Sequence, residues 1–396
     1  MERRGLLTPI LVGLVLLSFN LRPAAVSVGP VLEEVRDGLG MSAAAAGLLT
    51  SLPVIAFAVL GALAPASARR FGPHRVTFVA LLAAAAGLLG RALVDHQAAF
   101  LALSLLALGG MAMANVLIPS LVKRHYPDRL GTLTSVYTTA LAVGLTSAFV
   151  LTVPIAEAFG SWRAGLGAWA VLALVAAVPW IGLVRHDAPD PAAPVSARIV
   201  RFGDVARTRL GWAMALFFGL QSMQAYAIFG WFATLWRDNG FSPAVAGALV
   251  GVVAGISIPL SAWVPRLVAR PGEQRAVLFA VMLMYPVAYL GLVVAPHSLA
   301  VLWALVLGAG TTTFPMVLTL IGLRAATPEG TAALSSFTQS VGYLLAAVGP
   351  FGVGVLHDVS GGWTVPLVAL AVLVLPMLVL GTYVARVNYV EDQLAA

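Results

Sequence analysis

The sequence contains no cysteine, and charged residues make up only 10% of its 396 positions. Without cysteine there can be no disulfide framework and no thiol chemistry. Soluble domains contain about 25% charged residues, whereas this chain is 60% apolar. The composition therefore excludes a water-soluble globular protein and indicates an integral membrane protein whose main partner is the lipid bilayer.

Catalytic motifs are also missing. The sequence has no zinc-protease motif, no phosphate-binding loop, no dinucleotide fingerprint and no histidine cluster with metal-ligand spacing. We therefore predict that the chain is not an enzyme and that it uses no cofactor and no metal. Without a nucleotide site, any transport must be driven by solute gradients or run downhill.

Long apolar runs fill most of the chain and predict an all-α fold. A membrane-spanning helix needs about 20 apolar residues. The sequence offers twelve such segments, at residues 6–32, 43–66, 75–94, 97–122, 131–156, 164–184, 210–235, 243–266, 276–295, 298–322, 331–356 and 364–385.

The chain repeats itself at an offset of about 200 residues. Residues 40–49 resemble residues 240–249, and the same offset relates Pro65, Arg70, Gly72 and Arg75 to Pro265, Arg270, Gly272 and Arg275. We therefore predict two pseudo-symmetric six-helix bundles, residues 1–186 and 209–396, joined by a cytoplasmic linker at 187–208. Membrane transporters place their substrate site near the bilayer midplane, where such repeats meet.

Most of the 23 lysines and arginines fall on one side of this topology. The positive-inside rule makes that side cytoplasmic, so both termini are expected in the cytoplasm of a cell with this protein in its plasma or inner membrane. The same distribution accounts for the net charge of +7 without a nucleic-acid partner. We expect a monomer.

Twelve spans in two similar halves resemble the major facilitator superfamily. The loop at residues 61–75 is similar to its signature loop, although Pro65 stands where the usual form has an aspartate. The resemblance assigns a gating role to four residues of this loop: Gly61, Arg70, Gly72 and Arg75. Residues 20–23, 115–124, 221–226 and 339–343 look like the cyanate and 2-nitroimidazole transporter branch. This branch implies a small anionic or nitro-type solute and rocker-switch alternating access.

Arg22 is the ionisable residue deepest inside a span. It lies about 22 Å along the helix from its start, with roughly 14 Å of apolar sequence beyond it, and Pro23 should kink the helix there. No carboxylate stands near the centre of any span. A guanidinium in this position needs a counter-charge, which an anionic or nitro ligand could supply. The alternative is a structural arginine bonded to carbonyls that the kink frees.

Other polar and aromatic residues extend the expected substrate site. At an offset of 201, Asn20 corresponds to Gln221, so each half would contribute one amide. The remaining candidates are Asn115, Gln224, Tyr226, Gln339, Tyr343 and Phe314, the last beside a second expected proline break at Pro315. For each of them the alternative is helix packing or interhelical hydrogen bonding. Arg91, near the outer end of the third span, is expected to reach the membrane surface or cap its helix.

The leading hypothesis is a secondary active or facilitative transporter of a cyanate-like anion or a nitroimidazole. The alternative is a polyspecific drug exporter of the same superfamily, which the aromatic residues and methionines in the spans favour but Arg22 does not. A membrane sensor or scaffold is disfavoured because the short loops leave no room for an effector domain. A membrane enzyme is disfavoured because no catalytic constellation lies within a span.

Overall fold

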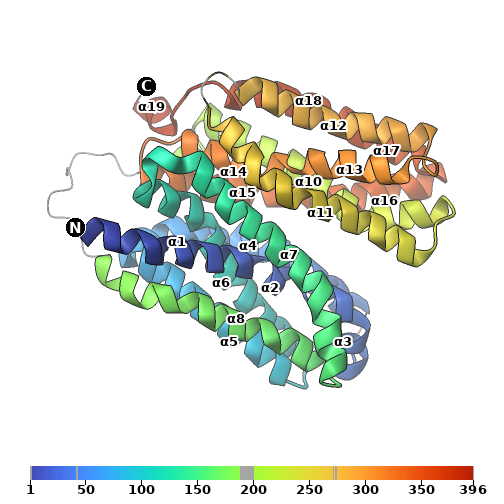
Figure 1. Cartoon of the computed structure of the whole chain (residues 1–396), viewed down its shortest axis with the longest axis horizontal. Coiled ribbons are helices and arrows are strands. Elements are labelled where there is room, and N and C mark those ends of the chain that lie inside the picture. Colours follow the sequence, from blue (N-terminus) through green and yellow to red (C-terminus); the bar gives the residue numbers. More distant parts are fainter. Residues whose placement is uncertain (1, 42, 188–199, 271, 273, 396) are drawn as a thin grey trace. The chain divides into compact units, whose positions relative to one another are not determined.

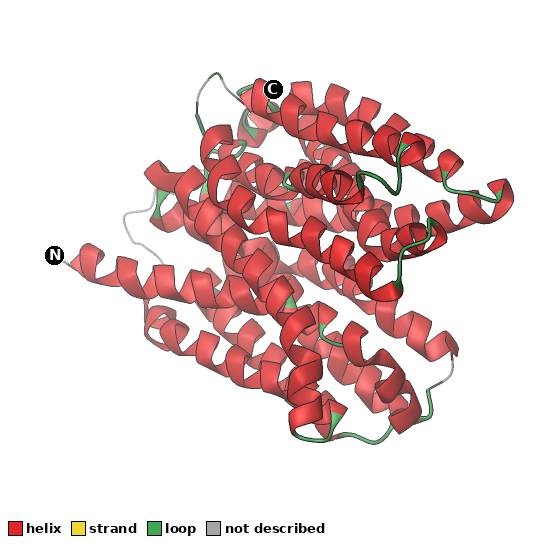
Figure 2. Cartoon of the chain, turned by 45° about the vertical axis from the view of Figure 1, so that its right-hand side comes forward, coloured by secondary structure: helices red, strands yellow, loops and turns green. Residues whose placement is uncertain are grey.

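The computed structural model describes residues 2–41, 43–187, 200–270, 272 and 274–395 (Figure 1). Throughout these residues the fold consists of helices joined by short loops, with no strand (Figure 2). Twelve helical segments within this described part of the chain are long and apolar enough to cross a membrane. The predicted all-α architecture with twelve spans is confirmed.

The helices of the first half begin with an interrupted span. This span comprises α1 (Glu2–Leu21) and α2 (Pro23–Val26), and a short helix α3 (Leu32–Leu39) follows. The remaining helices of this half are continuous: α4 (Ala43–Phe71), α5 (Pro73–Leu93), α6 (Gln97–His125), α7 (Leu130–Ala158) and α8 (Trp162–Leu183). Short 3₁₀ turns cover Gly29–Val31, Pro127–Arg129 and Val184–His186.

The second half begins with the single turn α9 (Phe202–Val205) and three long helices, α10 (Arg209–Asp238), α11 (Pro243–Val268) and α12 (Gln274–Val294). Its last three spans are interrupted. They comprise α13 (Ala300–Thr311) with α14 (Thr313–Leu323), α15 (Pro328–Ala346) with α16 (Val348–Ser360), and α17 (Thr364–Val372) with α18 (Val374–Val384). A final short helix is α19 (Val390–Ala395).

Each of these interruptions is followed by a proline within three positions. The breaks at Thr312, Ala347 and Leu373 each precede a proline by three positions, and the break at Arg22 directly precedes Pro23. Proline lacks an N–H and its ring crowds the carbonyl four residues earlier, so the helix ladder opens there. The expected breaks at Pro23 and near Pro315 are both present.

Contacts between residues divide the chain into two compact units. Unit 1 contains Met1–Pro127, Ala140–Phe202 and Thr327–Ser336, and unit 2 contains Asp128–Thr139, Gly203–Ala326 and Phe337–Ala396. The first part of α15 thus belongs to unit 1, where the Ser336 hydroxyl donates to the Gly61 carbonyl (3.2 Å). The first part of α7 belongs to unit 2, where the Thr138 hydroxyl lies 3.4 Å from the Ser261 carbonyl. Of the predicted linker at 187–208, residues 188–199 lie outside the described residues.

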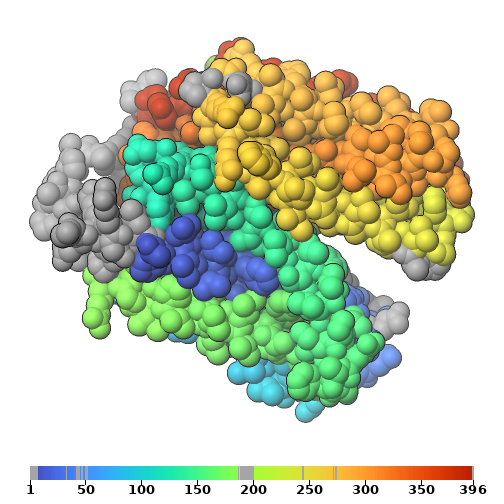
Figure 3. Space-filling view, viewed as in Figure 1, coloured from blue at the N-terminus to red at the C-terminus, as the bar shows by residue number. Residues whose placement is uncertain are grey.

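Large apolar side chains cover the outer faces of single helices. On α8 the exposed residues are Val171, Leu174, Val175, Val178 and Ile181, and on α12 they are Leu283, Val287, Leu290 and Val294. Their spacing of three and four places each set on one helix face. In the space-filling view, α8 forms part of the visible surface of unit 1 (Figure 3). Such apolar stripes suit contact with lipid chains and would be unfavourable in water.

Candidate functional site

Arg22 lies at the interruption between α1 and α2. Its backbone keeps helical angles (φ −86°, ψ −42°), and its carbonyl oxygen accepts from the amides of both Ala25 (3.0 Å) and Val26 (3.1 Å). The side chain is half-buried. The break therefore presents a cation inside the first span, as the position of Pro23 predicts.

Two predicted substrate-site residues of unit 1, Asn20 and Asn115, carry amide side chains on helices that pack against each other. Asn20 is fully buried at the end of α1, where its Nδ2 atom lies 3.5 Å from the Leu16 carbonyl. Its Oδ1 atom has no hydrogen-bond partner among the described residues. Asn115 is 6% exposed on α6, a helix that packs against α1. The buried Oδ1 atom of Asn20 is therefore an unused hydrogen-bond acceptor, which is costly for a protein.

In unit 2 the predicted aromatic residues gather around a residue that sequence reasoning missed. The buried ring of Phe218 on α10 lies 5.0 Å from the ring of Tyr343 on α15 and 6.0 Å from that of Phe314 on α14, measured between centroids. The ring of Tyr226 lies 6.4 Å from that of Tyr343. We call these four residues the Phe218 cluster. Phe218 is an apolar residue within an apolar run and carries no sequence signal that separates it from packing residues.

The predicted amides of unit 2 differ in how far their hydrogen bonds are satisfied. Gln221 is fully buried, and its Nε2 atom donates to Ser222 Oγ (2.5 Å), while its Oε1 atom has no partner within the described part of the chain. Gln224 instead donates to the Leu370 carbonyl (2.8 Å) and accepts from the Tyr289 hydroxyl (2.6 Å). Both ends of Gln224 therefore serve helix packing. Gln339 is fully buried on α15.

Replacing Tyr289 by phenylalanine tests this structural role of Gln224. We expect the free energy of unfolding to fall by about 1–3 kcal/mol, because the buried Oε1 atom of Gln224 loses its donor. The thermal midpoint of the purified protein in detergent measures the effect, and Tyr389→Phe at a partly exposed tyrosine is the matched control. An unchanged midpoint for Tyr289→Phe would return Gln224 to the substrate-site candidates.

A carboxylate completes the signature loop from an unexpected place. Asp187, predicted to begin the linker, turns into unit 1 and accepts from the Nδ1 atom of His74 (2.7 Å) and the backbone amides of Arg75 (2.7 Å) and His74 (3.3 Å). Gly72, with φ +90°, leaves room for it, because a Cβ atom there would lie 2.2 Å from the Asp187 Cγ atom. The loop thus has no acid at Pro65, and its residues His74 and Arg75 contact a carboxylate from the end of the sixth span.

The hydrogen bonds continue from His74 to a second histidine. The Nε2 atom of His74 lies 2.8 Å from that of His125 at the end of α6, so one of these two nitrogens carries the hydrogen that the other accepts. Burial favours a higher pKa for the Asp187 carboxyl group, but the hydrogen bonds from His74 and Arg75 outweigh it and hold that pKa below its ordinary value. The other predicted loop residues lie nearby in sequence: Gly61 is buried, and Arg70 and Arg75 are exposed.

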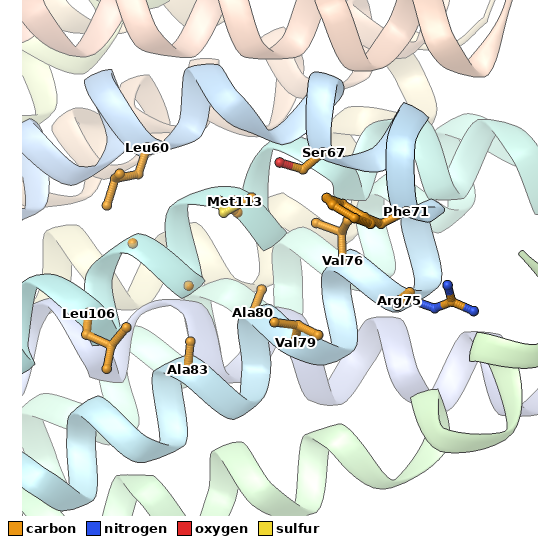
Figure 4. A pocket seen from close by; sticks show the side chains of 12 residues that line it. Leu60, Ser67, Phe71, Arg75, Val76, Val79, Ala80, Ala83, Leu106 and Met113 are labelled. Carbon is orange, nitrogen blue, oxygen red and sulfur yellow. The ribbon is translucent and has the colours of Figure 1, made fainter.

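A cavity of about 470 Å³ in unit 1 has an almost wholly apolar lining. Figure 4 shows Leu60, Ser67 and Phe71 of α4 opposite Val76, Val79, Ala80 and Ala83 of α5, with Leu106 and Met113 of α6. Arg75 stands at one end, its guanidinium group turned away from the cavity. This lining suits a hydrocarbon group and offers little to an anion, so we do not place the solute here.

The expectation that Arg91 reaches the membrane surface is wrong. Its side chain is only 1% exposed and points towards the segment after the α1 break, where its Nη2 atom donates to Ser27 Oγ (3.0 Å). Sequence position alone suggests an interfacial arginine, because Arg91 is near the end of α5. The interrupted first span covers it.

Comparison with known proteins gives two relatives of similar length. The chain is 34% identical to the "2-nitroimidazole transporter" of Escherichia coli over 378 residues, which are 95% of each protein. It is 27% identical to the "Cyanate transport protein CynX" of Escherichia coli over 358 residues, which are 89% of this chain and 91% of that protein.

A solved structure has the same fold. The proton:xylose symporter XylE superposes with a TM-score of 0.76 over 99% of both chains at 14% identity. The sequence model of the Major Facilitator Superfamily matches residues 10–350. Its members and the relatives above are transporters rather than enzymes. With its twelve membrane helices, this chain belongs to the Major Facilitator Superfamily.

Proposed function

We propose that the protein is a secondary active or facilitative transporter of a small anionic or nitro-type solute. It works by alternating access in the plasma or inner membrane, with both termini in the cytoplasm. Cyanate-like anions and nitroimidazoles are the solute classes. No cofactor takes part, and a single chain is the transporting unit.

The observation that carries this proposal is the position of Arg22 at the break in the first span. The fixed fork of a guanidinium group matches two oxygens of a planar oxyanion or a nitro group. Ionisable groups inside membrane spans are rare and mark solute pathways. The names of the two relatives, a 2-nitroimidazole transporter and a cyanate transport protein, support the same solute class.

Further residues of each unit suit such a solute. In unit 1, the Oδ1 atom of Asn20 can accept from an N–H group, as a nitroimidazole ring offers. In unit 2, the Oε1 atom of Gln221 has the same capacity, and the rings of the Phe218 cluster provide flat faces for stacking. We retain Asn115 and Gln339 as candidates and assign Gln224 to helix packing.

The test is uptake by proteoliposomes that contain the purified protein. Arg22→Gln should lower the initial rate for labelled cyanate or 2-nitroimidazole by at least about tenfold, the effect of one lost charge-assisted hydrogen bond. Arg22→Lys keeps the charge but loses the fork, so it should retain an intermediate rate.

Arg237→Gln is the matched control, because Arg237 is an exposed arginine at the end of a span. If Arg22→Gln transports at the normal rate, the charge does not recognise the solute. If the wild-type protein moves neutral or cationic drugs and neither anions nor nitroimidazoles, the drug-exporter alternative replaces this proposal.

A further inference from the structure

Arg91 is a second arginine inside the membrane region, and it is more deeply buried than Arg22. It belongs to α5, and its hydrogen bonds go to the segment that follows the α1 break. The Nη2 atom donates to Ser27 Oγ (3.0 Å), and the Nη1 atom lies 3.4 Å from the Ala24 carbonyl. The interruption of the first span thus supplies both partners of this guanidinium group.

These partners do not balance its charge. No carboxylate contacts Arg91 within the described residues, and its Nε atom has no hydrogen-bond partner there. A guanidinium group has five N–H donors, so several remain unused. A buried charge without a counter-charge is strongly unfavourable.

Two other arginines in the described part of the chain satisfy their guanidinium groups differently. Arg163 donates to the Asp95 carboxylate (2.6 Å), at the surface of unit 1. Arg324 is also buried, but its Nε and Nη2 atoms donate to the Val384 (2.7 Å) and Ala385 (3.0 Å) carbonyls at the end of α18. Carbonyls at a helix C-terminus carry partial negative charge. Arg91 has no carboxylate among its described hydrogen-bond partners, and the Ala24 carbonyl and Ser27 hydroxyl that it contacts belong to α2, a helix of a single turn, and to its C-cap.

Arg91 also lines a cavity of about 210 Å³. We call this cavity the Arg91 pocket; its lining comprises Ala24, Ala25, Val26, Val28, Gly29, Leu32, Leu49, Pro53, Arg91, Ser104, Leu108 and Phe149. Ser104 is 1% exposed, and its hydroxyl group has no partner in the described part of the chain. Two side chains with unused hydrogen-bonding atoms, Arg91 and Ser104, therefore line one cavity.

The size of the Arg91 pocket limits what it can hold. A water molecule occupies about 30 Å³ of liquid, so about 210 Å³ admits a small anion with a few waters. Drug-sized ligands use pockets of roughly 300–1,000 Å³. The rest of the lining consists of apolar side chains and a glycine, and surroundings of low polarity strengthen the attraction between an anion and Arg91.

We propose that the Arg91 pocket binds one small monovalent anion, which supplies the counter-charge of Arg91 and accepts a hydrogen bond from Ser104. The anion is either the transported solute or a resident inorganic anion such as chloride. This inference depends on the proposed function in one respect: the proposed function selects which solute anions are tested. Binding at equilibrium does not require transport.

The test uses the purified full-length protein in detergent with sodium gluconate as the background salt. Gluconate is replaced in steps, at constant ionic strength, by cyanate, nitrate or chloride, and the thermal midpoint is recorded. A bound anion raises the midpoint in a saturable way. We expect at least one of the three anions to do so.

Variants then assign the binding to this pocket. Ser104→Ala should weaken the anion affinity by about tenfold, the cost of one hydrogen bond to a charged group, and Arg91→Gln should abolish the saturable shift. Arg91→Lys keeps the charge without the fork and should weaken binding less than Arg91→Gln. Arg36→Gln, at an exposed arginine of the same unit, is the control and should leave the affinity unchanged.

The outcomes distinguish a bound solute from a resident anion and show whether the proposal fails. Binding of cyanate or nitrate that 2-nitroimidazole competes away identifies the solute, whereas chloride binding without such competition identifies a resident anion. If no anion raises the midpoint, or if Arg91→Lys and Ser104→Ala both bind the anion with wild-type affinity, the proposal is overturned. These two variants also carry the test if Arg91→Gln does not fold. If Arg22→Gln loses uptake but still binds the anion, the role of Arg22 in transport and anion binding by the Arg91 pocket are both supported, each by its own measurement.

Discussion

Asp187→Ala should destabilise unit 1 by about 1–3 kcal/mol, the usual cost of leaving hydrogen-bond donors without their acceptor. The carboxylate is 2% exposed and accepts from the His74 ring and from the amides of His74 and Arg75. Its removal leaves the buried His74 ring and the two backbone amides without this acceptor. Thermal unfolding of the purified protein, followed by tryptophan fluorescence, measures the loss.

The pH dependence of this effect has a definite sign. Hydrogen bonding lowers the pKa of Asp187 in the folded protein below its ordinary value. The carboxylate therefore stabilises the fold above the unfolded-state pKa, and this contribution is lost as the pH falls through the lower folded-state pKa. The difference in midpoint between wild type and Asp187→Asn should be constant near neutrality and shrink below about pH 4. Equal midpoints at pH 7 would contradict the role of this carboxylate.

Gly144→Leu should abolish uptake and lower the thermal midpoint sharply. A Cβ atom on Gly144 would lie 2.0 Å from the Phe19 carbonyl oxygen, so α7 and α1 meet backbone to backbone, one residue before Asn20. Overpacking against movable side chains costs about 1–3 kcal/mol. A helix backbone cannot yield so easily, so we expect a cost of about 3 kcal/mol or more.

Gly182→Leu is the matched control, because nothing lies within 4 Å of a Cβ atom built on that exposed glycine of the same unit. It should leave both uptake and the midpoint near the wild-type values. A graded series from Gly144→Ala to Gly144→Leu should show increasing loss. Similar midpoints for the leucine variants at both positions would show that α1 and α7 do not need this close approach.

Much of the fold follows from the sequence because the membrane imposes simple rules. Backbone groups in lipid must be satisfied within helices or barrels, so apolar runs of sufficient length predict helices directly. The break at Arg22 was predictable, because Pro23 removes a specific hydrogen bond. The interruptions at Ala347 and Leu373 were not predicted, although each has a proline three positions later. Prolines such as Pro119 and Pro286 lie within continuous helices, so the presence of a proline alone does not predict where a helix is interrupted.

The candidate site was less predictable, because it depends on contacts between distant segments. Asp187 follows the sixth span at the start of a polar, proline-containing stretch and carries no local sign that it turns back to His74, 113 positions earlier. Arg91 was misplaced for the same reason, because α2 covers it only in the folded chain. Pairing of Phe218 with Tyr343 likewise requires α10 and α15 to be neighbours.

The division of α7 and α15 between the units limits how the chain can be cut. A fragment ending at residue 187 would lack Thr327–Ser336, leaving the Ser120 hydroxyl and the Gly61 carbonyl without the acceptor and donor they use in the intact protein. The complementary fragment would lack Asp128–Thr139. We therefore expect that neither fragment alone folds as it does in the intact chain, and that each needs the other to complete its compact unit.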